Sequence, residues 1–312
     1  MNNEEKADLA YAQSVGIVNK TFKLYRSTPL CNYSADRRKQ KRLEKSLLQT
    51  LSSRLWFDPG DQSGMDIPSM TNSNITTYKG IIRSVSYRQL LIPDWPSDGH
   101  REPIELRVEL MSYDKNIQPV HQVIFFPPHR SEPPVAEGLT SFPLLLVKAT
   151  SGIGEIIIKW LQGVHDCVIN PFNVANKDLE EFVNTWTSSL LNRPAPPEER
   201  IEVAGTRMNQ PRPLELVYGL PGVFHLTSIT ISLEPSELRH MLRVALASRV
   251  TMMDAIKGHI LHTMSLDVQA LNLVRLGTHV AYLTNDGKIK LIPNAERRQT
   301  IEIIRRLTDL AS

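Results

Sequence analysis

The sequence has little cysteine, few aromatic residues and no long apolar run. Its 312 residues include two cysteines, Cys31 and Cys167, which are too few for a disulfide framework and favour a reducing compartment. No stretch approaches the roughly 18 to 20 uncharged apolar residues that a membrane-spanning helix needs, so we expect no membrane partner. The charged residues Glu4, Glu5 and Lys6 precede any apolar run, so the order typical of a secretory signal is also missing.

Motifs for catalysis and cofactor binding are equally scarce. The sequence contains no P-loop and no Gly-x-Ser-x-Gly elbow, and neither cysteine has a neighbouring histidine. Gly152-Ile153-Gly154 opens a predicted helix, but Ile157 stands where a dinucleotide fingerprint has its third glycine. His259 and His262 have helical spacing without an accompanying cysteine or acidic cluster. We therefore predict no cofactor, no metal and no enzymatic activity; an enzyme assembled from dispersed residues is the alternative.

The net charge of +3 conceals an uneven distribution along the chain. Residues 1–58 carry eleven Lys or Arg and six Asp or Glu, a net of +5. Residues 59–200 carry twelve and seventeen, a net of -5, and residues 201–312 carry thirteen and ten, a net of +3. Both ends of the chain are therefore basic, which raises the question of what anion they face.

Most of the N-terminal excess lies in one run from Asp36 to Lys45. Six cations stand there against two acids: Arg37, Arg38, Lys39, Lys41, Arg42 and Lys45. Cations in a first helical turn oppose the helix dipole by about 0.3–1 kcal/mol each, whereas a polyanion that binds them gains from counterion release. We predict these six residues as DNA-binding. A solvated basic face or a nuclear-localisation signal would also explain the run.

The hydrophobic pattern predicts an α+β fold of mainly antiparallel sheets flanked by helices, ending in a β-hairpin and a C-terminal helix. Short connections without room for crossover helices favour antiparallel pairing. Strands are predicted over 15–24, 81–92, 104–111, 120–126, 139–147, 214–218 and 224–233. Helices are predicted over 34–56, 151–164, 176–190, 235–246, 252–262 and 294–310.

Breaks in this pattern predict four parts along the chain. Residues 1–150 hold an N-terminal strand, the basic helix and antiparallel strands, with a loop over 58–76. Residues 151–192 form a helical pair, and the proline-rich residues 193–200 form a linker. Residues 201–312 form a C-terminal α+β part with a partner-binding hairpin.

The hairpin is the clearest local signal in the sequence. Residues 272–284 and 288–292 are apolar runs on either side of Asn285-Asp286-Gly287, which predicts a type I′ turn. Lys288 and Lys290 alternate onto one face, and Arg275 lies within reach in the preceding run. If the outer strand is covered within the chain, the hairpin is only architecture. If it is an edge, it suits β-augmentation by a partner.

The order of several motifs along the chain resembles that of the centromere protein L family. The motifs are Tyr25-Arg-Ser-Thr-Pro-Leu-Cys-Asn-Tyr33, Phe142-Pro-Leu-Leu-Leu, Asp166-Cys-Val-Ile-Asn-Pro-Phe-Asn173, Trp186, Leu233-Glu-Pro-Ser-Glu-Leu238, Leu273-Val-Arg-Leu and Asn285-Asp-Gly-Lys-Ile-Lys-Leu291. None of them contains a catalytic residue.

The resemblance implies a structural subunit of the inner kinetochore, in the nucleus, at the centromere of the chromosome. It implies pairing with centromere protein N through the C-terminal sheet, contacts with centromere protein C and other inner-kinetochore subunits, and binding of centromeric nucleosome or DNA. Carried onto this sequence, the partner-binding candidates are Arg275, Lys288, Ile289, Lys290 and Leu291. The alternative is a self-associating DNA-binding protein of recombination or repair.

Overall fold

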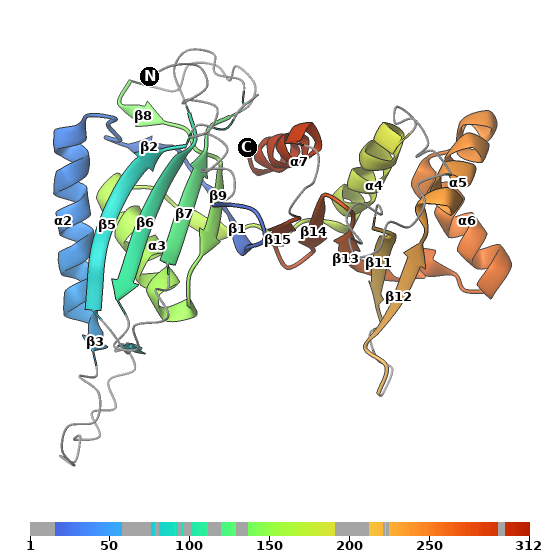
Figure 1. Cartoon of the computed structure of the whole chain (residues 1–312), viewed down its shortest axis with the longest axis horizontal. Coiled ribbons are helices and arrows are strands. Elements are labelled where there is room, and N and C mark those ends of the chain that lie inside the picture. The colour runs from blue at the N-terminus through green and yellow to red at the C-terminus, as the bar shows by residue number, and fades with distance from the viewer. Residues whose placement is uncertain are drawn as a thin grey trace, which may run out of the picture. The chain divides into compact units, whose positions relative to one another are not determined.

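A computed structural model of the chain has the mixed α+β architecture that the sequence predicts (Figure 1). The structure describes residues 16–57, 76–78, 81–90, 92, 95, 102–111, 120–128, 137–190, 212–220, 222, 225–292 and 297–312. The predicted loop over 58–76, apart from its last residue, and the predicted linker over 193–200 lie outside these residues. The chain divides into two compact units: unit 1 is Met1–Phe172 with Ile304–Ser312, and unit 2 is Asn173–Ile303.

Unit 1 is built on an antiparallel sheet with the strand order β5-β6-β7-β9-β1. Its strands are β1 (Thr21–Ser27), β5 (Ile81–Gln89), β6 (Ile104–Met111), β7 (Val120–Phe126) and β9 (Leu144–Lys148), and β10 (Ile169–Pro171) pairs with part of β1. Two short pairs accompany it: β2 (Leu30–Cys31) with β8 (Leu139–Thr140), antiparallel, and β3 (Leu55–Phe57) with β4 (Thr76–Tyr78), parallel. The predicted antiparallel pairing is confirmed.

Two helices cover one face of this sheet. They are α2 (Arg37–Arg54) and α3 (Ser151–His165), and Figure 1 shows α3 behind the strands and α2 beside β5. Alternate strand residues such as Val108, Val123 and Leu145 point into the core that the helices close. The Gly152-Ile153-Gly154 segment begins α3 after a strand of this antiparallel sheet, so it lacks the parallel βαβ context of a dinucleotide fingerprint.

Unit 2 has a second run of antiparallel strands, in the order β12-β11-β13-β14-β15. They are β11 (Leu214–Gly219), β12 (Ser228–Leu233), β13 (Asn272–Gly277), β14 (Ala281–Thr284) and β15 (Lys288–Leu291). Its helical elements are α4 (Asn176–Leu190), α5 (Pro235–Ser248), α6 (Met252–Met264) and the short η1 (Val268–Ala270). The last helix, α7 (Arg297–Ala311), begins in unit 2 and ends with residues of unit 1. Helices α3 and α4, predicted as a pair, belong to different units.

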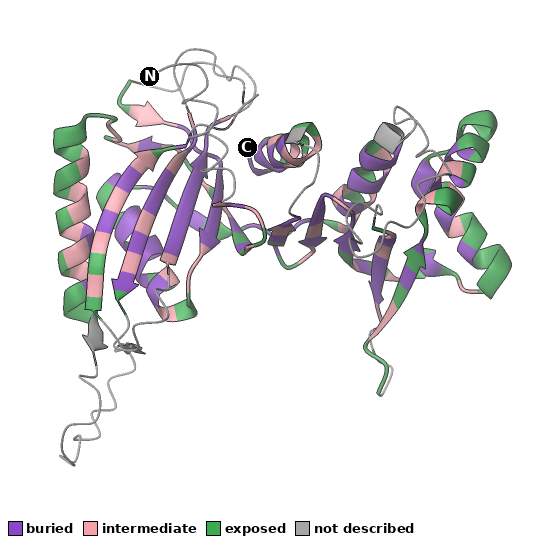
Figure 2. Cartoon of the chain, viewed as in Figure 1, coloured by how far each residue is buried: buried purple, intermediate pink, exposed green. Residues whose placement is uncertain are grey.

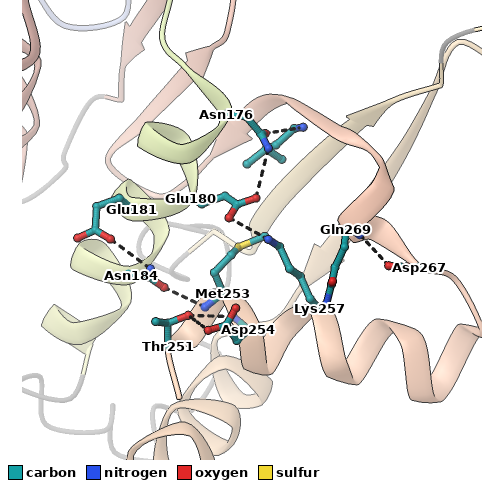
Figure 3. Close-up of polar contacts among 11 residues, drawn as sticks. Asn176, Glu180, Glu181, Asn184, Thr251, Met253, Asp254, Lys257, Asp267 and Gln269 are labelled. Atoms are coloured by element: carbon teal, nitrogen blue, oxygen red, sulfur yellow. Dashed lines mark hydrogen bonds and ion pairs between the residues drawn. The ribbon is translucent and has the colours of Figure 1, made fainter. Parts of the chain in front are cut away.

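Polar side chains join α4 to its neighbours in unit 2 (Figure 3). The Asn176 carboxamide oxygen accepts the backbone N–H of Leu273, 2.8 Å away, at the start of β13. One turn further along α4, Glu180 forms an ion pair of 2.8 Å with Lys257 of α6. Asn184 accepts a backbone N–H from the first turn of α6 at 2.9 Å. These contacts fix α4 against β13 and α6.

Candidate nucleic-acid and partner surfaces

Helix α2 carries the predicted DNA-binding residues and is anchored by its opposite face. Leu47 and Leu51 are fully buried, and they hold α2 against β5 and α3. At its start, the Asp36 carboxylate accepts the backbone N–H of Arg38 at 2.8 Å, which satisfies one of the unpaired donors of the first turn. The cap is thus Asp36, two residues after the Ser34 at which the helix was predicted to begin.

All six predicted DNA-binding residues are exposed on α2. Figure 2 shows exposed positions along this helix. Five of them have no ion pair within the described part of the chain: Arg38, Lys39, Lys41, Arg42 and Lys45. We call these five residues the α2 basic surface. The i, i+4 and i+7 spacing of Arg38, Arg42 and Lys45 puts them on one side of the helix, away from Leu47 and Leu51. Like charges at such spacing destabilise a helix by about 0.2–0.5 kcal/mol per pair, so an external anion would relieve a standing repulsion.

Arg37, the sixth residue, is also exposed, but it bonds to neighbouring groups of the protein. Its Nη1 lies 3.1 Å from Glu44 Oε1 and donates to the backbone carbonyl of Tyr87 in β5 at 3.2 Å. The same Glu44 oxygen accepts the backbone N–H of Tyr87 at 2.8 Å. Strand β5 is outermost in the unit 1 sheet, so these two side chains supply the partners that a neighbouring strand would have given Tyr87.

The predicted hairpin forms, but its turn is not of type I′. A type I′ turn needs positive φ at both central residues, whereas of Asn285, Asp286 and Gly287 only Gly287 has one, at 74°. The Gly287 N–H donates to the carbonyl of Thr284 at 3.1 Å. This arrangement fits a three-residue loop in which a type I turn is followed by a left-handed glycine. The predicted strand over 272–284 is also divided into β13 and β14.

The five predicted partner-binding residues have different environments. Ile289 and Leu291 are fully buried, so they contribute to the core of the chain and offer no side chain to a partner. Lys288 is exposed and forms an ion pair with Asp286, whose pKa the hydrogen bond from this lysine lowers, with help from Thr284. Lys290 is half-buried. Arg275 is exposed on β13, 4.0 Å from Glu215.

Strand β12 forms an outer edge of the unit 2 strands, which sequence reasoning missed. The N–H of Leu220 bonds to the carbonyl of Thr227 at 3.0 Å, so in this antiparallel register Ile229 and Ile231 point their backbone groups at β11. The backbone groups of Thr230 therefore point away from β11, and they have no partner among the described residues. Strand β12 has no charged residue and no proline. The uncharged run was visible in the sequence, but its place at an edge was not.

The described residues show neither a metal-binding cluster nor a membrane-spanning helix. No group of three His, Cys, Asp or Glu within them could hold a metal ion, and His259 and His262 are exposed on α6. An apolar cavity of about 20 Å³ lies in unit 2 beside Trp186 and Leu276, with room for no more than a water molecule. None of the helices in the described ranges is long and apolar enough to cross a bilayer.

These features define an α+β protein that presents a cationic helix and an unpaired strand edge, the attributes of a macromolecule-binding subunit. Residues 16–312 match the family of centromere protein L, and the chain belongs to that family, as the ordered motifs indicated. The inner kinetochore subunit fta1 of Schizosaccharomyces pombe is 27% identical over 157 residues, which are 50% of this chain and 49% of that protein.

Two vertebrate proteins named centromere protein L are also similar to this chain. Those of Bos taurus and Homo sapiens are each 24% identical over 185 residues, which are 57% of this chain and 48% of each relative. The matched region thus spans about half the length of these relatives.

Proposed function

We propose that the protein is a structural subunit of the inner kinetochore, located in the nucleus at the centromere, which pairs with centromere protein N and helps hold centromeric nucleosome or DNA. Membership of the centromere protein L family and the similarity to an inner kinetochore subunit support this role. Centromere protein C and other inner-kinetochore subunits are the further partners in this proposal. The role requires binding surfaces and no catalysis.

The α2 basic surface is the observation that carries the DNA-binding part of the proposal. Five exposed cations without ion pairs in the described residues lie on a helix whose other side is fixed in the core. Their mutual repulsion costs folding energy, and phosphate groups would turn that cost into a favourable interaction through counterion release. A face kept only for solubility would not need this clustering.

Reversing the charge of this surface tests the proposal. The triple variant Arg38→Glu, Lys41→Glu, Arg42→Glu should bind duplex DNA at least tenfold more weakly in the complex with centromere protein N. The slope of log affinity against log salt should fall by about 0.9 for each phosphate group that the variant no longer neutralises. A matched control reverses three exposed cations on other helices, Lys159→Glu, Lys177→Glu and Arg243→Glu. Equal affinity of the triple variant and the control would reject the α2 basic surface.

We place the pairing with centromere protein N on the sheet of unit 2. The outward backbone groups of β12 can accept a strand from the partner. Arg275 lies two strands further in, on the same face as Thr230, since both residues are opposite Val217 of β11. A partner segment that continues over this face would reach Arg275. At β15, the partner can meet the side chains of Lys288 and Lys290, whereas Ile289 and Leu291 remain in the core.

The unpaired edge of β12 also supports a second candidate, self-association in a DNA-binding protein of recombination or repair. Two copies could pair their β12 strands about a twofold axis. Sedimentation equilibrium of the isolated chain would show a dimer under this alternative and a monomer under the first. Mass spectrometry of proteins copurified from chromatin would separate kinetochore from repair partners.

A further inference from the structure

The strands of unit 2 have one face against helix α4 and a second face that points away from it. Leu276 and Leu283 line the small cavity beside α4, so they belong to the first face. Gly277 follows Leu276 and Tyr282 precedes Leu283, so both belong to the second, which we call the reverse face. The residues of the reverse face are Thr230, Ser232, Glu215, Val217, Arg275, Gly277, Tyr282, Thr284, Lys288 and Lys290. All of them except Val217 and Gly277 are exposed or half-buried.

A row of five residues, one from each strand, crosses the reverse face. The register places Ser232 opposite Glu215 and Glu215 opposite Gly277. It then places Gly277 opposite Tyr282 and Tyr282 opposite Lys290. Directly opposite positions in antiparallel strands lie about 5 Å apart, so the row is continuous from the edge strand β12 to β15. Tyr282 is the one aromatic residue of the reverse face.

The ring of Tyr282 lies against the backbone of Gly277. A Cβ atom at Gly277 would be 2.6 Å from Cε1 and 2.8 Å from Cδ1 of this ring, and 3.2 Å from the Cβ of Glu215. Carbon atoms pack at about 3.5–4.0 Å, so the ring occupies space that any other residue would need. The φ angle of Gly277 is not positive, so the backbone itself does not require glycine. The glycine therefore fixes the ring, with its other side turned away from the sheet.

Cations border this ring. Lys290, directly opposite Tyr282, has no ion pair within the described part of the chain. Arg275, two residues before Gly277, lies 4.0 Å from Glu215, and both side chains are partly exposed. An ion pair of that length and exposure contributes little to stability. Both cations can therefore accept an acidic group from outside, and Glu215 competes for one of them.

The composition of the reverse face fits a polypeptide better than a nucleic acid. Glu215 lies in the middle of the row, where its carboxylate would repel a phosphate backbone. Tyrosine and arginine are the residue types that contribute most to protein interfaces, and Tyr282 and Arg275 supply one of each. The row also starts at Ser232 of β12, the edge strand to which we assign strand addition. A segment that follows an added strand can thus cross this row.

We propose that Tyr282 is an anchor of the heterodimer interface. An apolar side chain of the partner packs on the outer side of the ring, and acidic side chains of the same segment pair with Arg275 and Lys290. The proposal rests on the pairing with centromere protein N proposed above, and it adds the chemistry of the partner segment. Because Glu215 competes for Arg275, it lowers the affinity of the pair.

Removing the ring tests the anchor. Threonine suits a strand, so Tyr282→Thr should keep the fold and weaken the heterodimer about thirtyfold in isothermal titration calorimetry. Tyr282→Phe keeps the ring and should bind within about twofold of the unchanged chain. Tyr25→Thr is the matched control, because it removes a half-buried strand tyrosine from unit 1. A ring that only covers Gly277 would lower the melting temperature of Tyr282→Thr and leave its affinity unchanged, which would overturn the proposal.

The acidic character of the partner segment has its own test. Lys290→Glu should weaken the heterodimer about tenfold, whereas Arg243→Glu, an exposed cation of α5, should not. Glu215→Gln removes the competitor for Arg275 and should strengthen the heterodimer about two- to fivefold. Weaker binding of Glu215→Gln would mean that the partner presents a cation here, and the proposal would be wrong.

The edge variant Thr230→Pro separates the anchor from the pairing itself. If Thr230→Pro abolishes the heterodimer and Tyr282→Thr leaves its affinity unchanged, the pairing stands and the anchor is wrong. If the unchanged chain does not bind centromere protein N, both are wrong. If Tyr282→Thr reduces binding of a single-stranded oligonucleotide, or self-association, at unchanged heterodimer affinity, the reverse face binds something else and the proposal is overturned.

Discussion

The strands β5 and β12 are both outermost in their unit, but their exposed backbone groups are treated differently. At β5, the N–H and the carbonyl of Tyr87 are bonded by Glu44 and Arg37 of α2. At β12, the corresponding groups of Thr230 have no partner in the described residues, and no charge or proline protects the strand. An unprotected edge is a template for another strand, so the difference favours β12 over the part of β5 around Tyr87 as the place for a partner.

Helix α2 can bond to the backbone of β5 and also expose cations because its sides face different surroundings. Its apolar side packs on the sheet, its flank bonds to Tyr87, and its cations point outward. The DNA-binding surface that we propose is therefore as rigid as the core beneath it. A substitution that detaches α2 from the sheet should expose the backbone of Tyr87 and displace the α2 basic surface at the same time. Such a substitution is therefore the strongest test of the difference between the two edges.

Truncating the anchor of α2 should have the largest effect. Leu51 is fully buried, so Leu51→Ala should lower the free energy of unfolding of unit 1 by about 3 kcal/mol, through reduced burial and a residual cavity. Leu246→Ala is the control, because Leu246 is 59% exposed, and it should change the stability by less than about 0.5 kcal/mol. Denaturant unfolding of both variants measures the difference. Equal stability of the two variants would contradict the anchoring role of Leu51.

Acid should loosen unit 1 by nearly as much. Burial, assisted by the charge of Lys148, lowers the pKa of His121 to about 4, from a usual value of 6.5. The folded state thus favours the neutral imidazole. The resulting contribution to the free energy of unfolding is fully present above pH 6.5 and is lost as pH falls through 4. The loss is about 3 kcal/mol. His121→Gln should remove this dependence from unfolding curves between pH 7 and 4, and an unchanged dependence would refute the assignment.

Removing the bond that closes β5 should cost somewhat less. Glu44→Ala deletes the acceptor of the Tyr87 N–H and the partner of Arg37, which should lower stability by about 2 kcal/mol, as for a hydrogen bond to a charged group. Glu44→Gln keeps an acceptor oxygen and loses only the charge, so about half of that loss is expected. Hydrogen exchange at Tyr87 should accelerate more in the alanine variant. Equal exchange in both variants would mean that Glu44 does not protect this edge.

Local patterns in the sequence were sufficient for most of the elements. Leucines at three- and four-residue spacing predict α2, and alternating apolar runs predict β5, β6 and β7 to within a few residues. The exposure of the six cations follows from the same helical pattern. Each of these features depends on residues close together in the chain.

Features that depend on distant residues or on a single dihedral angle could not be predicted. The bond from Arg37 to the backbone of Tyr87 joins residues fifty positions apart in the chain, and the unit 1 sheet requires β5, β6, β7 and β9 in register. The turn type depends on the φ angles of Asn285 and Asp286, which the sequence Asn-Asp-Gly does not determine. The edge position of β12 is a property of strand order, and no local pattern contains it.

The smallest effect on stability is expected for a substitution at the outer edge of β12. Proline lacks a backbone donor and is tolerated in an edge strand where the N–H points outward. Thr230→Pro should therefore change the free energy of unfolding by about 1 kcal/mol or less, while it abolishes strand addition at β12. Size-exclusion chromatography with centromere protein N, combined with denaturant unfolding of the free chain, measures both effects.

Moving the same substitution by one residue supplies the control. The N–H of Ile231 points at β11, so Ile231→Pro breaks the ladder inside unit 2 and should destabilise it by about 3 kcal/mol or more. A stable Thr230→Pro chain that still forms the heterodimer would remove β12 from the interface. Loss of the heterodimer at unchanged stability would instead locate the partner at the outward edge of β12.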